Sequence, residues 1–135
     1  MALAIEDYAL IGNLRTAALV GRDGAIDWLC WPQFDSPACF AALLGDGENG
    51  CWRIAPAAAH QPVARRYREG TLVLETGFAT ATGRRRLIGF RRPSDGRNDL
   101  VRIVEGVEGE VAVRGDLAIR FDYGALVPGV QRTPA

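Results

Sequence analysis

Short apolar runs separated by glycine-rich turns make up most of this sequence. Two of these runs, at about 16–20 and 25–30, flank the segment Gly21-Arg22-Asp23-Gly24. A short loop that ends in Asp-Gly between apolar runs is typical of a β-hairpin, because glycine adopts positive φ angles without steric penalty. We therefore expect two antiparallel strands, at about 16–20 and 25–30.

The segment from 111 to 123 alternates apolar and charged residues with a period of two. Such alternation is typical of an antiparallel strand with one face toward the core and the other toward water. The apolar face comprises Val111, Val113, Leu117, Ile119, Phe121 and Tyr123, and the charged face comprises Arg114, Asp116, Arg120 and Asp122.

Roughly seven or eight such strands, with turns every eight to twelve residues, predict a mostly β fold and an antiparallel β-sandwich. One short helix is expected near 36–44, where Ser36 offers a cap, Pro37 fits the first turn and Gly45 ends the run. Because residues 127–135 form a tail with no closing element, the sandwich can also be read as an incomplete supersandwich.

Composition limits the range of functions. The 135 residues suffice for one domain, and 16 Lys+Arg balance 16 Asp+Glu, so no net charge favours nucleic acid. No apolar run reaches the roughly twenty residues of a membrane span, and a cytoplasmic location is expected. Cys30, Cys39 and Cys51 lack metal-ligand or disulfide spacing, so we expect no metal and no cofactor.

Aromatic and acidic residues gather in the stretch 24–37, GAIDWLCWPQFDSP. Aromatic rings beside carboxylates suit a sugar, and glycoside hydrolysis needs two facing carboxyl groups. The plainer interpretation puts Asp27 on the polar face of a strand, and Asp35 then caps the helix region at 36–44 or tightens the turn. A sugar contact at Trp31, Phe34 and Asp35 stays open, and no catalytic residue is assigned.

Several blocks of the sequence resemble, in order, the N-terminal region of bacterial glycoside hydrolase family 15 proteins, which include glucoamylase and trehalase-like enzymes. The matching blocks are 5–13, 16–24, 26–30, 34–37, 66–67, 71–76, 100–106 and 119–124. The resemblance covers about residues 5 to 128.

This resemblance implies an N-terminal β-sandwich region, here residues 1–135, that precedes an (α/α)6 barrel. In that family the barrel supplies the two glutamates that hydrolyse an α-glucoside with inversion. The barrel is absent from this chain, so whether the chain belongs to an enzyme depends on the parent protein, and the chain alone is expected to be inactive. It would pack on a barrel downstream and shape the rim of the glucoside site.

Two departures from the family pattern stand out. Gly89-Phe90-Arg91-Arg92-Pro93 occupies the place where the family commonly reads Asp-Phe-Met-Pro, and Pro128-Gly129-Val130 stands where Pro-Trp-Val is expected.

Two other functions remain open at this stage. The chain could be an autonomous carbohydrate-binding or scaffolding module that binds an α-glucoside or glucan. It could also be a truncated relative that acts as a structural homodimer, because an incomplete sandwich leaves strand edges that a second copy can cover.

Overall fold

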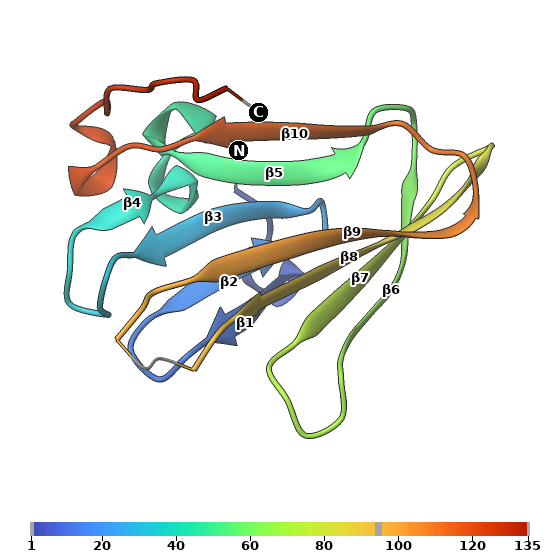
Figure 1. Ribbon diagram of the computed structural model, residues 1–135, viewed down its shortest axis with the longest axis horizontal. Coiled ribbons are helices and arrows are strands. Elements are labelled where there is room, and N and C mark those ends of the chain that lie inside the picture. Colours follow the sequence, from blue (N-terminus) through green and yellow to red (C-terminus); the bar gives the residue numbers. More distant parts are fainter. Residues whose placement is uncertain (1, 94–95, 135) are drawn as a thin grey trace.

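The computed structural model describes residues 2–93 and 96–134. It is built of two antiparallel sheets that face each other (Figure 1), so the predicted mostly β sandwich is confirmed. None of the helices in these residues is long and apolar enough to cross a bilayer.

The first sheet, sheet A, has the order β1-β2-β3-β5-β10, with β4 paired to β3, and the second, sheet B, has the order β6-β7-β8-β9. The strands of sheet A are β1 (Tyr8–Gly12), β2 (Ala17–Gly21), β3 (Ala25–Cys30), β4 (Ala38–Phe40), β5 (Cys51–Pro56) and β10 (Val113–Ala118). Those of sheet B are β6 (Gln61–Tyr67), β7 (Leu74–Ala79), β8 (Gly83–Arg91) and β9 (Leu100–Gly109). Short 3-10 turns are η1 (Ile5–Asp7), η2 (Ala42–Leu44), η3 (Gly47–Asn49) and η4 (Asp122–Gly124).

The predicted hairpin is confirmed as β2 and β3, which pair antiparallel across the turn at 21–24. Gly24 closes this turn with φ +82°, and its N–H donates to the carbonyl of Gly21 at 3.0 Å. A Cβ at Gly24 would press on the carbonyl oxygen of Ile54 in β5. Glycine is therefore required there both for its backbone angle and for the close approach of β5.

The predicted helix near 36–44 is wrong. Residues Ala38–Phe40 form β4, which pairs with β3 through Leu29 and Phe40, and only the 3-10 turn η2 follows. A surface helix needs a polar face, whereas every residue from 38 to 42 is buried. Burial between the sheets therefore overrides the capping signal at Ser36 and Pro37.

The core lies between the two sheets. It is formed by Ile11, Ala18, Val20, Ile26, Leu29, Cys39, Phe40 and Leu74. Asp27, expected on the polar face of its strand, is instead 7% exposed and accepts a 2.6 Å hydrogen bond from the Tyr8 hydroxyl. The structure thus corrects that expectation: Asp27 is a buried acceptor of sheet A.

The alternating segment at 111–123 forms a strand only over β10, which pairs with β5. Leu117 lies opposite Trp52 in that pairing, on the face that turns toward sheet B. This apolar face is incompletely covered, because Val113 and Leu117 remain exposed. The sandwich is open on the side where β9 and β10 run (Figure 1).

Candidate functional site

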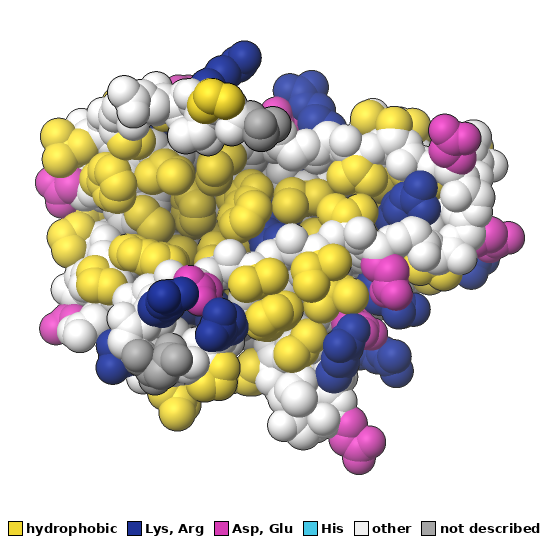
Figure 2. All heavy atoms as spheres, viewed as in Figure 1, with side chains coloured by type: hydrophobic (Ala, Val, Ile, Leu, Met, Phe, Trp, Pro, Cys, Tyr) yellow, Lys and Arg dark blue, Asp and Glu magenta, His cyan; other side chains and the backbone are white. Residues whose placement is uncertain are grey.

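A cleft of about 540 Å³ opens between the sheets on the side of β9 and β10. We call it the inter-sheet cleft. Its lining is Leu29, Trp31, Cys39, Phe40, Trp52, Asn98, Asp99, Leu100, Val101, Leu117, Ile119 and Phe121. Figure 2 shows hydrophobic side chains gathered over this region, between β10 and β9. An opening of this size and composition is typical of a binding or docking surface.

An arginine lies beneath one wall of the cleft. Arg91, at the end of β8, is 4% exposed, and its guanidinium stacks on the Trp31 ring with Cζ 4.7 Å from the centroid. Its Nη2 donates to Asn98 Oδ1 at 3.4 Å, while Nε and Nη1 have no hydrogen-bond partner among residues 2–93 and 96–134. Burial lowers the pKa of Arg91. This guanidinium is therefore buried and only partly hydrogen-bonded.

A second arginine, which is half-buried, joins the two sheets. Arg102 of β9 donates to the carbonyls of Trp52 at 2.6 Å and Gly24 at 2.5 Å, and its Cζ lies 5.2 Å from the Trp52 ring centroid. Burial lowers the pKa of Arg102 to about 10. Unlike Arg91, this guanidinium satisfies backbone acceptors, so it connects β9 to β5 and the β2–β3 turn.

The polar groups on the cleft wall already have partners within the domain. Asn98 donates to the carbonyl of Pro32 at 3.3 Å and accepts from Arg91, and Asp99 pairs with Arg92 at 3.3 Å. The cleft therefore offers apolar surface and few free hydrogen-bonding groups. Such a surface selects apolar side chains over a ligand rich in hydroxyls.

The three candidate sugar contacts do not converge on one cavity. Trp31 lines the inter-sheet cleft, whereas Phe34 and Asp35 line a shallow depression with Leu14, Arg15 and Gln33. Phe34 is 61% exposed, and its N–H donates to the carbonyl of Arg15 at 2.9 Å. Phe34 and Asp35 therefore occupy an exposed rim at the end of the sandwich, and Trp31 lies inside it.

Acid–base chemistry is found away from the cleft. Burial first, and the hydrogen bond to Asp27 second, raise the pKa of Tyr8 to about 12, and burial raises the pKa of Asp27. This pair holds β1 to β3 and is buried in sheet A. Within the described residues, no group of three His, Cys, Asp or Glu side chains could hold a metal.

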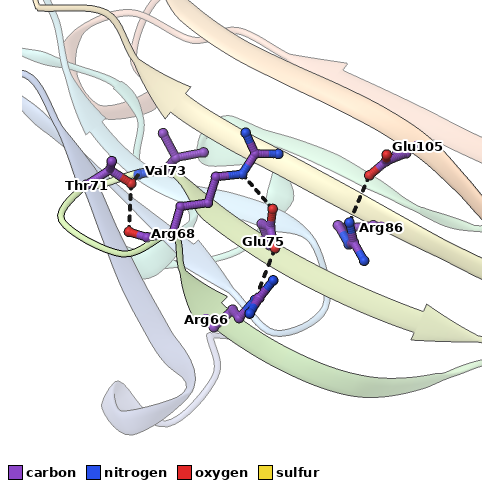
Figure 3. Close-up of polar contacts among 7 residues, drawn as sticks. All are labelled: Arg66, Arg68, Thr71, Val73, Glu75, Arg86 and Glu105. Atoms are coloured by element: carbon purple, nitrogen blue, oxygen red, sulfur yellow. Dashed lines mark hydrogen bonds and ion pairs between the residues drawn. The ribbon is translucent and has the colours of Figure 1, made fainter.

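The outer face of sheet B is covered by ion pairs (Figure 3). Glu75 of β7 is hydrogen-bonded by Arg68 at 2.6 Å and Arg66 at 3.2 Å, and Arg86 pairs with Glu105 on neighbouring strands at 3.1 Å. The hydrogen bond from Arg68 is the largest cause that lowers the pKa of Glu75. These arginines therefore pair with acids of the same sheet.

Comparison with known proteins identifies the family. Residues 1–133 match the family model described as trehalase-like, N-terminal. The chain belongs to this family. No solved structure matches the chain.

The curated relatives are trehalases. The chain is 34% identical to a trehalase of Mycobacterium tuberculosis over 90% of the chain and 21% of the relative. It is 33% identical to a trehalase of Thermoplasma volcanium over 95% of the chain and 22% of the relative. A trehalase of Mycolicibacterium smegmatis is 42% identical over 58% of the chain and 12% of the relative. The chain thus spans about a fifth or less of the length of these relatives, as an N-terminal part of a larger trehalase-like protein would.

Sequence reasoning found Trp31 but missed most of the cleft. Trp52, Leu117 and Phe121 come from three separate segments, and only the pairing of β5 with β10 brings the first two together. The one available signal was the apolar face of the alternating segment at 111–123. No pattern in the sequence indicated the buried position of Arg91.

Proposed function

We propose that this chain is the non-catalytic N-terminal domain of a trehalase-like α-glucoside hydrolase. It packs on the (α/α)6 barrel of its parent protein, and it shapes the rim of the glucoside site through the loop that holds Trp31, Phe34 and Asp35. The inter-sheet cleft carries this proposal, because an apolar opening of about 540 Å³ on a small domain is a surface that another part of a protein covers.

The share of the relatives that this chain spans supports the same proposal. The chain corresponds to 21% of the Mycobacterium tuberculosis trehalase, which leaves most of such a protein to supply a catalytic domain. The proposal includes that the barrel of the parent protein hydrolyses its α-glucoside with inversion at the anomeric carbon, as in glycoside hydrolase family 15. The three free cysteines fit a reducing compartment, and a cytoplasmic location completes it.

A chimera tests this function. The chain replaces the matching segment of the Mycobacterium tuberculosis trehalase, and hydrolysis of trehalose is measured for the chimera and for the 135-residue chain alone. We expect turnover by the chimera and none by the chain. A chimera that is inactive, or an isolated chain that hydrolyses trehalose, would refute the proposal.

The rim is tested in the same chimera. Phe34→Ala and Asp35→Asn should raise KM for trehalose at least threefold, because both side chains would contact the bound sugar. Leu14→Ala is the matched control, since Leu14 is 95% exposed and lines the same depression. Equal KM values for all three variants would remove the rim from the proposal and leave the packing role intact.

An autonomous carbohydrate-binding module is the second candidate, because Trp31 and Trp52 both line the cleft. A guanidinium already lies over each of these rings, which reduces the aromatic surface that a sugar can cover. Titration of the isolated chain with trehalose and maltose separates the candidates. Saturable binding that Trp31→Ala abolishes would favour the module.

A further inference from the structure

The strands that end the two sheets are protected differently on the two sides of the sandwich. These terminal strands are β1 and β10 in sheet A and β6 and β9 in sheet B, with β4 paired to β3 beside the path of sheet A. On one side, the edges β1 and β6 are tied together. The Tyr67 hydroxyl on β6 accepts from the Leu10 N–H at 3.0 Å and donates to the Leu10 carbonyl at 2.7 Å.

Other features also protect this closed side. Arg65 on β6 donates to the carbonyls of Asp7 and Val20 at 2.8 and 3.1 Å, which links β6 to sheet A. Pro62 has no backbone N–H, so it removes one hydrogen-bond donor from β6. The register of the pairing between β6 and β7 also shifts between Pro62 and Arg65. Proline, irregular pairing and covering side chains are the usual means by which proteins prevent addition of a strand to an edge.

The open side lacks proline in its edge strands and covering side chains, although the pairing of β8 with β9 has one register shift, between Arg84 and Arg85. In residues 2–93 and 96–134, no side chain hydrogen-bonds to the backbone of β9 or β10. The strand β9 spans Leu100–Gly109 and is the longest in the protein, and it exposes Ile103, Val104 and Val107. A long edge with exposed apolar side chains and without proline or a covering side chain is a template for strand addition.

We propose that the β9 edge receives an extended segment from the rest of the same trehalase-like polypeptide. The segment adds to sheet B as a further strand and places its alternate apolar side chains in the inter-sheet cleft. This inference rests on the proposed function, and it specifies how the N-terminal domain engages the remainder of the protein. The apolar walls and the internally bonded Asn98 and Asp99 favour apolar side chains as the occupants of the cleft.

The occupant is the same polypeptide rather than a second copy of the chain, because the relatives extend far beyond the part that this chain spans.

Amide hydrogen exchange tests the proposal with the isolated chain and with the chimera that carries the chain in the Mycobacterium tuberculosis trehalase. Alternate amides of an edge strand point away from its partner and exchange quickly. We expect fast exchange at alternate amides of β9 in the isolated chain, and at least tenfold slower exchange of these amides in the chimera. The amides of β6 should exchange at the same rate in both proteins.

A pair of substitutions sharpens the test. Val104→Lys puts a charge at the open edge, and Val63→Lys puts the same charge on β6 at an exposed valine. In the chimera, Val104→Lys should restore fast exchange of β9 amides, and Val63→Lys should not. Chemical unfolding of both isolated variants verifies that each is folded.

The outcomes separate this inference from the proposed function. An active chimera in which β9 amides exchange as fast as in the isolated chain would overturn strand addition and leave the proposed function standing. An inactive chimera with protected β9 amides would refute the proposed function and support strand addition. Slow β9 exchange in the isolated chain, without self-association, would show that the edge is not free and overturn the inference. Slow β9 exchange in an isolated chain that self-associates would identify a second copy as the occupant and also overturn it.

Discussion

The substitution Arg91→Met should stabilise the domain. The Arg91 side chain is 4% exposed, and two of its three guanidinium nitrogens lack a hydrogen-bond partner in the described part of the chain. A buried donor without a partner costs about 1–3 kcal/mol, so two of them cost about 2–6 kcal/mol. Methionine is unbranched, adapts to irregular space and introduces no polar group.

The substitution also removes interactions, which sets the net effect. Stacking of the guanidinium on Trp31 stabilises by about 0.5–2 kcal/mol, and the 3.4 Å bond to Asn98 by about 1 kcal/mol. Asn98 Oδ1 keeps a donor, because Asn13 Nδ2 lies 3.5 Å from it. With central values of about 4 kcal/mol gained and about 2 kcal/mol lost, the free energy of unfolding should rise by about 2 kcal/mol, or roughly 6–10 °C in Tm for a domain of this size.

Equilibrium unfolding in urea, followed by tryptophan fluorescence, measures this gain, with the m-value checked for constancy. Arg92→Met is the matched control, because Arg92 is 54% exposed and pairs with Asp99 at the surface. It should change the free energy of unfolding by less than about 1 kcal/mol. If Arg91→Met instead destabilises the domain by more than about 1 kcal/mol while Arg92→Met is neutral, the Arg91 charge is well satisfied and the reasoning is refuted.

Two further predictions concern a buried acid and a turn. Burial raises the pKa of the Asp27 carboxyl above its ordinary value of 3.8. The stability that the protonated carboxyl contributes is therefore fully present below pH 3.8 and is lost as the pH rises through the raised pKa. Asp27→Asn, which keeps an acceptor for the Tyr8 hydroxyl, should flatten this decline in urea unfolding from acid to neutral pH; an unchanged pH profile would contradict the assignment. Gly24→Ala should lower the free energy of unfolding by more than about 2 kcal/mol, because a Cβ at φ +82° meets the Ile54 carbonyl. Its control Gly70→Ala has φ +71° and open space, so its loss should stay near the backbone cost of about 1–2 kcal/mol, and equal losses at both sites would refute the role of the Ile54 contact.

Local patterns were sufficient to predict the sandwich and the hairpin of β2 and β3. The turn at 21–24 and the two apolar runs beside it are neighbours in the sequence, so they can be recognised without knowledge of the rest of the fold. The helix near 36–44 failed for the opposite reason. Ser36 and Pro37 give a local capping signal, but pairing of Phe40 with Leu29 buries the segment on all sides.

The candidate site was only partly accessible to sequence reasoning. Trp31 was found because it sits in a dense aromatic stretch, and its separation from Phe34 and Asp35 depends on how the loop turns. Trp52 joins the cleft only through the pairing of β5 with β10, which connects distant parts of the chain. A single sequence holds no local pattern that reports such long-range placement.

The open side of the sandwich couples the stability of this domain to what covers it. A partner that binds the folded domain but not the unfolded chain adds to its stability, by an amount that increases with the ratio of partner concentration to Kd. A segment of the same polypeptide acts at an effective concentration in the millimolar range, far above that of a separate molecule. Under the proposed strand addition, the exposed Ile103, Val104 and Leu117 would be tolerable, because the covering segment would be covalently attached. The asymmetry between the closed side at Tyr67 and the open side at β9 follows from this: an edge needs protection only where no strand of the same protein is to be added.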